Sequence, residues 1–338
     1  MPAEHFLKRA WWAALAYSVA FKYVVLEFFG KRLKKNGGVK AYPKQNGKEA
    51  VVTGGSRGIG LEIVNNLLQC GYNVIIGSSS SKENRNNLEQ SLQKKYPGCT
   101  VEVWHLNLAS LKSVKNFAEL YLSRKEAIHL LINNAGIMFV PQEITEDGYE
   151  KHFAVNYLGH CLLTQLLLPT LDKSGSKICK SRIINCSSCI HYVGNTDINN
   201  FQHWQYYSKY KAYIQSKLAQ VMFTYSLQDY FNKKHTNVCV NSVHPGVVNT
   251  ELMNSVLLIP SLGPLLFKSA KEGAETATYT ALSAEMEGVG GKYLEECKIV
   301  NSSKISQIDS VQKELWKYTW NALRAWMAEN DFLFSVST

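Results

Sequence analysis

The feature that most constrains this chain is a glycine-rich turn between a short apolar run and a helical segment. The turn reads TGGSRGIG over residues 53–60, and the apolar run covers residues 50–53. After the turn, Ile59, Ile63 and Leu67 recur at helical spacing. Glycines permit a tight turn and let backbone N–H groups approach a phosphate, whose charge the helix N-terminus favours. The pattern predicts a dinucleotide-binding turn, and a glycine-rich surface turn is the alternative.

Short apolar runs and helical stretches alternate through the rest of the chain. Buried strands are predicted at 50–53, 73–77, 101–106, 128–133, 182–186 and 238–243. Helices are predicted near 58–70, 82–95, 110–124, 145–171 and 211–233. Continuous apolar runs are typical of strands that helices cover on both faces. The sequence therefore predicts an α/β fold, with a Rossmann-type doubly wound parallel sheet in a single domain over residues 48–338.

The positive charge of the chain is concentrated at its N-terminus. The net charge is +10, of which residues 1–48 carry +8 and the other 290 residues carry +2. A nucleic-acid-binding protein spreads its basic charge over the folded surface, whereas here it flanks one hydrophobic stretch. We therefore expect a membrane surface as a partner and no nucleic acid.

The hydrophobic stretch at residues 10–29 has about the length of a bilayer span, although Lys22 and Glu27 interrupt its second half. We expect a hydrophobic N-terminal helix that anchors the protein, with basic flanks, over residues 1–35, followed by a linker at 36–47. A cleaved signal peptide of a secreted protein and a soluble amphipathic helix are the alternatives. Cations on both sides leave the orientation open, and Asn301 begins a glycosylation sequon that is usable only in the lumen.

Eight cysteines are scattered through the chain without a dense spacing pattern, which indicates reduced thiols rather than a disulfide framework. Cys186 and Cys189 form a CxxC, but no second CxxC accompanies them. We therefore expect no metal site.

The spacing GxxxGxG and the run Asn-Asn-Ala-Gly at 133–136 resemble the short-chain dehydrogenase/reductase superfamily, over roughly residues 48–300. The resemblance implies an oxidoreductase that acts on CH–OH groups with NAD(H) or NADP(H). The cofactor-binding residues that it implies are Gly54, Ser56, Arg57, Gly58, Ile59, Gly60, Asn107, Asn134, Ala135, Gly136, Tyr213, Lys217, Pro245, Gly246, Val248 and Thr250.

The end of the second predicted strand bears on the choice between the two cofactors. An NAD enzyme usually has an acid there for the ribose 2′-hydroxyl, but this chain has GSSSS over residues 77–81. Arg57 in the glycine turn could contact a 2′-phosphate, because a guanidinium suits phosphate. NADP(H) is favoured, and NAD(H) stays open.

Tyr213 and Lys217 are the expected acid/base pair. A phenol with a pKa near 10 needs a nearby cation to work at neutral pH, and the spacing i, i+4 places both side chains on one helical face. Tyr207 and Lys211 share that spacing. The run AYIQSK at 212–217 resembles the family far better, so Tyr213 is preferred.

Two further catalytic residues follow from the resemblance. Ser188, at the end of the fifth strand, corresponds to the hydroxyl that bonds the substrate oxygen, and Ser187 is the neighbour that could be mistaken for it. Asn156 corresponds to the residue that holds a water for proton relay. The turn at residues 244–250 would contact the nicotinamide amide.

The segment after that turn bears on the substrate. Residues 251–267 are very apolar for a loop, and we expect a substrate loop at about 251–270 that meets an apolar ligand, a membrane face or both. Ordinary packing of two short helices is the alternative. A C-terminal stripe at helical spacing is expected to be core, and its members are Trp316, Trp320, Leu323 and Met327.

Within the superfamily, the run NYLGH at 156–160 and the turn after the sixth strand resemble the retinol-dehydrogenase-type branch. Residues 267–293 resemble members whose implied substrates are polyisoprenoid alcohols such as polyprenol or dolichol. A retinol or steroid enzyme and a non-catalytic or secreted regulatory protein are the alternatives. The resemblance implies membrane association, at the endoplasmic reticulum or lipid droplets, and allows a homodimer through the helices that carry Asn156 and Tyr213.

Overall fold

A computed structural model describes residues 3–33, 42–197, 207–249 and 267–327. Its centre is an eight-stranded sheet in the order β3-β2-β1-β4-β5-β6-β7-β8, in which only β8 runs antiparallel to its neighbour. The strands are β1 (Glu49–Thr53), β2 (Asn73–Ser78), β3 (Val101–His105), β4 (Leu130–Asn133), β5 (Ser181–Cys186), β6 (Val238–His244), β7 (Lys292–Glu295) and β8 (Lys298–Val300).

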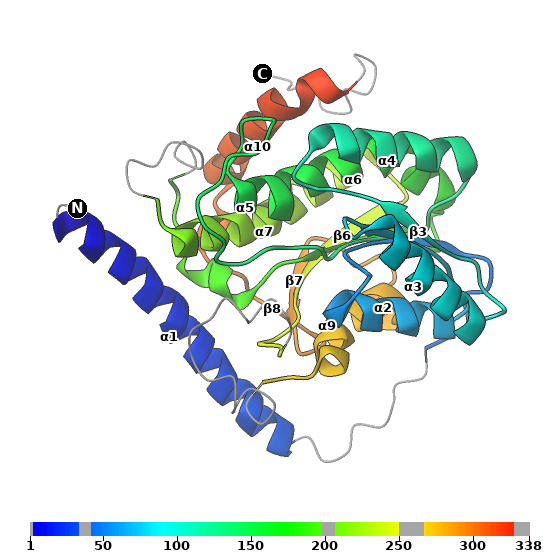
Figure 1. The fold of residues 1–338 in the computed structure, drawn as a ribbon, viewed down its shortest axis with the longest axis horizontal. Helices are drawn as coiled ribbons and strands as arrows, with labels where there is room; N and C mark the ends of the chain where they lie inside the picture. Colours follow the sequence, from blue (N-terminus) through cyan, green and yellow to red (C-terminus); the bar gives the residue numbers. More distant parts are fainter. Residues whose placement is uncertain (1–2, 34–41, 198–206, 250–266, 328–338) are drawn as a thin grey trace.

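Helices cover both faces of this sheet (Figure 1). One apolar core packs α2 (Gly58–Gln69), α3 (Lys82–Lys95) and α9 (Ala270–Leu282) against one face. The other core packs α4 (Leu111–Arg124), α6 (Gly159–Ser174), α7 (Lys209–Lys234) and α10 (Asp309–Leu323) against the opposite face. The predicted doubly wound α/β fold in a single domain is confirmed.

The helix expected at 145–171 begins later than predicted. Ile144 and Glu150 form an isolated bridge around Gly148, whose φ is +84°. The Glu150 side chain then accepts the N–H of Phe153 at 2.8 Å and caps the short helix α5 (Lys151–Phe153). A π-helical turn at Ala154–Leu158 follows and leads into α6.

The C-terminal helix α10 lies on α7, and it carries the apolar stripe that the sequence predicts as core. Trp320 and Leu323 are buried in the core that α10 shares with α7, and the ring of Trp316 stacks on Phe223 with centroids 6.0 Å apart. The stripe is therefore core, as expected.

The N-terminal helix α1 (Ala3–Leu33) lies beside the α/β body (Figure 1). Of the helices in the described residues, it alone is long and apolar enough to cross a membrane, over Phe6–Gly30. Ala16 is buried against the body. Large apolar side chains elsewhere on the helix are exposed, and these are Phe6, Leu7, Trp11, Phe21, Leu26 and Phe29.

All eight cysteines lie in the described part of the chain and are free thiols, as the scattered spacing predicts. Cys186 and Cys189 are both buried, and burial raises the pKa of the Cys186 thiol to about 12. The CxxC therefore presents no thiolate at neutral pH.

Candidate active site

Four neighbouring strands place the predicted site residues at one side of the sheet, where the carboxyl ends of these strands lie. β1, β4, β5 and β6 are parallel and adjacent in the sheet, so their carboxyl ends meet at the same side. The glycine turn follows β1, the Asn-Asn-Ala-Gly run follows β4, the serine pair follows β5, and residues 245–249 follow β6. This is the edge at which open α/β sheets bind ligands.

The glycine turn leaves no room for side chains at its key positions. Gly54 and Gly58 have φ values of +65° and +55°, in the region that glycine tolerates. A Cβ atom on Gly60 would lie 2.3 Å from the carbonyl oxygen of Gly54. Among the described residues, no side chain caps the first turn of α2, and that turn contains no acid. The free N–H groups of this helix end therefore fit a pyrophosphate.

Thr53 ties the glycine turn to the end of β4. Its hydroxyl accepts the backbone N–H groups of Asn134 and Ala135, both at 3.0 Å, and lies 2.9 Å from Nε2 of His160. Burial lowers the pKa of His160 to about 4, so the ring is neutral. Its Nδ1 lies 3.1 Å from the carbonyl oxygen of Asn156, which leaves Nε2 to accept from Thr53.

The end of β2 brings together the groups that would meet the adenine ribose. Ser78 donates from its hydroxyl to that of Ser56 at 3.2 Å, which connects the glycine turn to β2. Arg57 is exposed beside this contact. Arg85, in the first turn of α3, also lies at this strand end, because it donates to the carbonyl oxygen of Ser80, and the sequence did not predict it as a site residue. The helix cap at 81 was the signal that could have found it.

Asn107 follows β3 in an exposed loop. Its Oδ1 accepts the N–H of Ala109 at 3.1 Å, and its own N–H donates to Ser113 Oγ at 3.0 Å. The side-chain oxygen therefore shapes the turn before α4 and leaves the amide N–H₂ as the group that could face a ligand.

Tyr213 and Lys217 lie one turn apart on the buried side of α7. The Lys217 ammonium donates to the carbonyl oxygen of Cys186 at 2.8 Å and to Gln220 Oε1 at 3.1 Å. It lies 5.9 Å from the centre of the Tyr213 ring. Burial lowers the pKa of Lys217 to about 8, and burial raises the pKa of Tyr213, against which a hydrogen bond with Ser188 acts.

The serine pair after β5 divides into two roles. Ser187 is buried and donates from its hydroxyl to the carbonyl oxygen of Lys217 at 2.8 Å. Ser188 is only half-buried and hydrogen-bonds Tyr213. Ser188, which the sequence predicts as the catalytic serine, is therefore the one whose hydroxyl faces the phenol of Tyr213.

Asn156 lies in the π-helical turn, fully buried. Its Oδ1 accepts the N–H of Ile137 at 2.8 Å, and its Nδ2 donates to Ile137 O at 3.0 Å and to Ser216 Oγ at 2.9 Å. A Cβ atom on Gly136 would lie 3.3 Å from Asn156 Oδ1 and 3.5 Å from Lys217 Nζ. The strand end, α7 and the π-turn therefore converge on one point.

The alternative pair, Tyr207 and Lys211, is engaged in other contacts. The Tyr207 hydroxyl donates to Glu150 Oε1 at 3.0 Å, and Lys211 pairs with Asp197 at 3.0 Å. Burial raises the pKa of Tyr207, and the Glu150 carboxylate adds to that rise. These contacts are structural, which supports the choice of Tyr213.

The turn after β6 is described up to Asn249, so the predicted contact residue Thr250 lies outside the described residues. Gly246 has a φ of +95°. Val248 forms a parallel bridge with Lys268, whose N–H donates to Val247 O at 2.9 Å. Pro245 is half-buried. Most of the expected substrate loop, about 251–270, also lies outside the described residues.

An apolar cluster packs around the Tyr213 ring. Phe139 lies edge-on to that ring, with centroids 5.2 Å apart, and its φ of +54° is strained for a bulky residue. The helix α1 contributes Ala16 to the cluster, with Trp12 and Val19 packed against it. The N-terminal helix is therefore part of the wall of this site.

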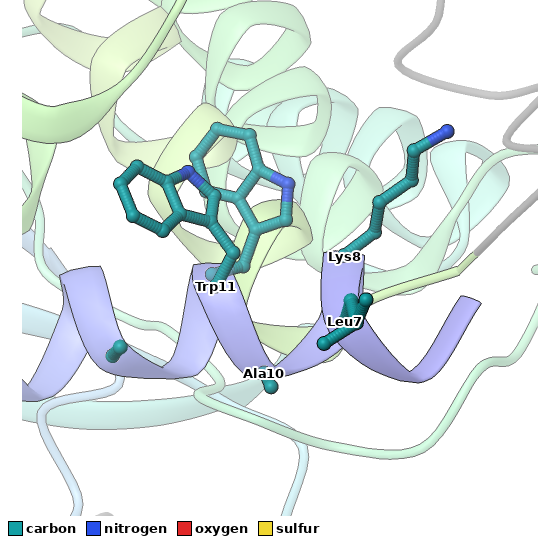
Figure 2. Close-up of a pocket in the computed structure, with 6 residues that line it drawn as sticks. Leu7, Lys8, Ala10 and Trp11 are labelled. Carbon is teal, nitrogen blue, oxygen red and sulfur yellow. The ribbon is translucent and has the colours of Figure 1, made fainter. Parts of the chain in front are cut away.

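An open apolar pocket of about 570 Å³ lies on the N-terminal half of α1 (Figure 2). Figure 2 labels Leu7, Lys8, Ala10 and Trp11, all carried by this one helix. Trp12 lines the same pocket and also packs against the cluster around Tyr213. The pocket and the apolar cluster around Tyr213 thus have one side chain in common.

The family model for short chain dehydrogenases matches residues 48–258. The chain belongs to the short-chain dehydrogenase family. Members of this family use NAD(P)(H), and the chain is an NAD(P)-dependent alcohol oxidoreductase, as the sequence predicts.

Relatives in this family match four fifths or more of the chain. A polyprenol dehydrogenase of Danio rerio is 40% identical over 307 residues, which is 89% of this chain and 93% of that protein. The human polyprenol dehydrogenase is 41% identical, over 81% of this chain and 84% of its own. Human retinol dehydrogenase 12 is 37% identical, over 82% and 86%. The expected resemblance to the retinol-dehydrogenase-type branch is confirmed.

Solved structures of other proteins share the fold. An uncharacterised protein from Mycobacterium paratuberculosis superposes with a TM-score of 0.69 at 27% identity, over 84% of this chain and 96% of that one. A short-chain dehydrogenase from Burkholderia cenocepacia in complex with NADP gives a TM-score of 0.59 at 22% identity, over 74% and 96%.

Proposed function

We propose that this short-chain dehydrogenase interconverts a polyisoprenoid alcohol of the polyprenol or dolichol type and its carbonyl product, with NADP(H) as the preferred cofactor. The observation that carries the proposal is the buried pair Tyr213 and Lys217 beside Ser188, walled by apolar side chains of α1. Such a wall suits a long apolar substrate with one reactive oxygen. The polyprenol dehydrogenases among the relatives support the same substrate class.

Each catalytic residue has a role that follows from its contacts. Tyr213 takes the alcohol proton during oxidation and returns it during reduction, because its hydroxyl adjoins Ser188 in a buried site. Lys217 stabilises the phenolate by its charge, and Ser188 hydrogen-bonds the substrate oxygen. The role of Asn156 rests on the family resemblance, in which this residue holds a water that passes the proton onward, since its own amide N–H groups are taken by Ile137 and Ser216. When bound, the cofactor supplies or accepts the hydride.

Four groups of residues would hold the cofactor. The helix end at Gly58–Gly60 would take the pyrophosphate, and Lys217 would bind the nicotinamide ribose. The nicotinamide would lie at the turn after β6. Arg57 and Arg85 would bind a 2′-phosphate, since the end of β2 carries serines and no acid. This charge balance favours NADP(H) over NAD(H).

We infer that α1 lies flat on the membrane rather than across it, with residues 1–35 as the anchor, 36–47 as the linker and 48–338 as the catalytic domain. One side of α1 packs on the catalytic domain, and its exposed side chains combine six large apolar ones with cations such as Lys8 and Lys22. Helices of this kind lie in the interface of a bilayer. The endoplasmic reticulum or lipid droplets would then be the location, and a cleaved, secreted form is the alternative.

A homodimer stays a prediction. α10 packs on α7, so that much of α7 is buried within one chain. A dimer formed through α6 and α7, as the family resemblance allows, would have to use the part of these helices that α10 leaves uncovered.

The test is an assay of the purified full-length chain in detergent. Polyprenol, the aldehyde of dolichol, retinal and a steroid ketone are each offered with NAD(H) and with NADP(H). Turnover of the polyisoprenoids with NADP(H) is expected. Turnover of retinal or the steroid alone would move the assignment to the retinol or steroid class, and no turnover with any substrate would favour a non-catalytic member.

A further inference from the structure

A carboxylate of the N-terminal helix reaches the turn after β6. Glu27 of α1 is only 8% exposed, and its two carboxylate oxygens accept the backbone N–H of Val247 at 3.1 and 3.3 Å. Burying a carboxylate in a helix of otherwise apolar character is costly unless it is hydrogen-bonded. The contact joins residues that are 220 positions apart in the sequence.

A second polar contact accompanies it one turn earlier on α1. The Tyr23 hydroxyl donates to the carboxylate of Glu295 in β7, at 2.9 and 3.1 Å from its two oxygens. The Tyr23 ring lies edge-on to His244, the last residue of β6, with centroids 5.3 Å apart. Two side chains of α1 therefore contact the segment at the end of β6 from the same helix.

The turn itself is held from two sides. Lys268 donates its N–H to Val247 O at 2.9 Å and accepts the N–H of Asn249 at 2.8 Å, so one side of the turn is fixed by backbone pairing. Glu27 supplies the acceptor for the N–H of Val247. Gly246, immediately before, has a φ of +95° and adds no side chain that could restrain the turn.

We propose that Glu27 is a positioning residue, which fixes the turn Pro245–Val248 in the conformation that receives the nicotinamide end of the cofactor. The helix α1 then serves two purposes, because the same element that meets the membrane completes the cofactor site. The inference rests on the proposed cofactor site, since the turn matters for binding only if the nicotinamide lies there.

The consequence for substitutions follows from hydrogen bonding. Glu27→Leu leaves the buried Val247 N–H without an acceptor and frees the turn, which we expect to weaken NADPH binding by about 5- to 100-fold. Glu27→Gln keeps an acceptor oxygen of the same size, so its binding should stay within about threefold of the wild type. Lys22→Gln removes a charge from an exposed position of the same helix and serves as the matched control.

The experiment is an equilibrium titration of the full-length protein in detergent with NADPH, followed by fluorescence and without a lipid substrate. Thermal unfolding of each variant is measured in parallel. Weak binding by Glu27→Leu, with near-normal binding by Glu27→Gln and Lys22→Gln, supports the inference. Should Glu27→Leu not fold, Glu27→Ala takes its place in the comparison with Glu27→Gln.

Equal NADPH affinity in the wild type and in the folded Leu or Ala variant would overturn the inference. The two proposals fail in different ways. A wild-type protein that does not bind NADPH contradicts the proposed cofactor site. A wild-type protein that binds NADPH but turns over no polyisoprenoid contradicts only the proposed substrate, and leaves the role of Glu27 testable. In active protein, Glu27→Leu should raise the KM for NADPH more than the KM for the lipid.

Discussion

The ammonium of Lys217 lies 5.9 Å from the centre of the Tyr213 ring, one helical turn further along α7. Both side chains are buried, and burial shifts the two pKa values toward the neutral forms. With a pKa of about 8, Lys217 is still mostly an ammonium at neutral pH, while the phenol of Tyr213 is protonated. The negative charge of a bound dinucleotide would raise the pKa of Lys217 and so strengthen the positive charge that lowers the pKa of the phenol.

Tyr213→Phe should lower turnover by about 10²- to 10⁴-fold, because the variant lacks the acid/base while the cofactor site is kept. NADPH binding, measured by titration, should change little. Tyr207→Phe is the matched control, since it removes the same hydroxyl from a buried tyrosine. It should keep turnover and lose about 1 kcal/mol of stability with the Glu150 hydrogen bond. Normal turnover in Tyr213→Phe would rule out its assignment.

Lys217 should make stability depend on pH in the alkaline range. Burial lowers its pKa from the usual 10.5 to about 8. Between these values the unfolded chain binds a proton that the folded chain does not, so the free energy of unfolding rises with pH. Below about pH 8, Lys217 is protonated in both the folded and the unfolded chain. The folded chain then bears the full cost of burying the ammonium charge.

The difference in unfolding free energy between wild type and Lys217→Met isolates this effect. It should grow in favour of the wild type by up to about 3 kcal/mol from pH 7 to 10.5. Urea unfolding at several pH values measures it on both proteins. A difference that does not vary with pH would show that Lys217 keeps its ordinary pKa.

Ser188→Ala and Ser187→Ala each remove one hydroxyl, but the first should lower turnover and the second should lower stability. Ser188→Ala removes the hydroxyl beside Tyr213, and a loss of about 10²-fold in kcat is expected. Ser187→Ala removes a bond to the Lys217 carbonyl, which should cost about 1 kcal/mol of stability and little turnover. Equal losses of kcat in the two variants would contradict the division of roles.

Arg57→Ala and Arg85→Ala should each weaken NADP(H) binding by about 10- to 100-fold, because in the proposed cofactor site each would remove a charge-assisted contact to the 2′-phosphate. Binding of NAD(H), which lacks that phosphate, is the internal control and should be nearly unchanged. Parallel titrations with both cofactors measure this. Equal weakening for both cofactors would place the arginines elsewhere in the site.

The six strands β1 to β6 could be predicted because each contains a short apolar run. The pair β7 and β8 was missed for a physical reason. Each strand has at most four residues and carries lysine or glutamate, and the turn between them uses Glu296 and Cys297 at positive φ instead of glycine. Neither the apolar pattern nor the residues of the turn predict this hairpin.

Only some of the contacts in the site could be predicted from the sequence. The choice of Ser188 over Ser187 could be made only from the family resemblance, because the direction of each hydroxyl depends on the path of the chain after β5. In the sequence, Glu27 is only an interruption of the apolar stretch. Its contact with Val247 could not be predicted, because Val247 is distant in sequence. Long-range pairing of this kind leaves no local signal.

The π-helical turn at Ala154–Leu158 makes the position of Asn156 depend on chain length. Such a turn contains one residue more than an α-helix of the same rise would hold. Removing a single residue there would restore the α-helix and rotate α5 and its preceding loop against α6 by about 100°. Asn156 would then leave Ile137 and Ser216, although no residue of the site had been replaced. Among homologous chains, the preservation of this one surplus residue is thus as informative about function as the identity of the asparagine.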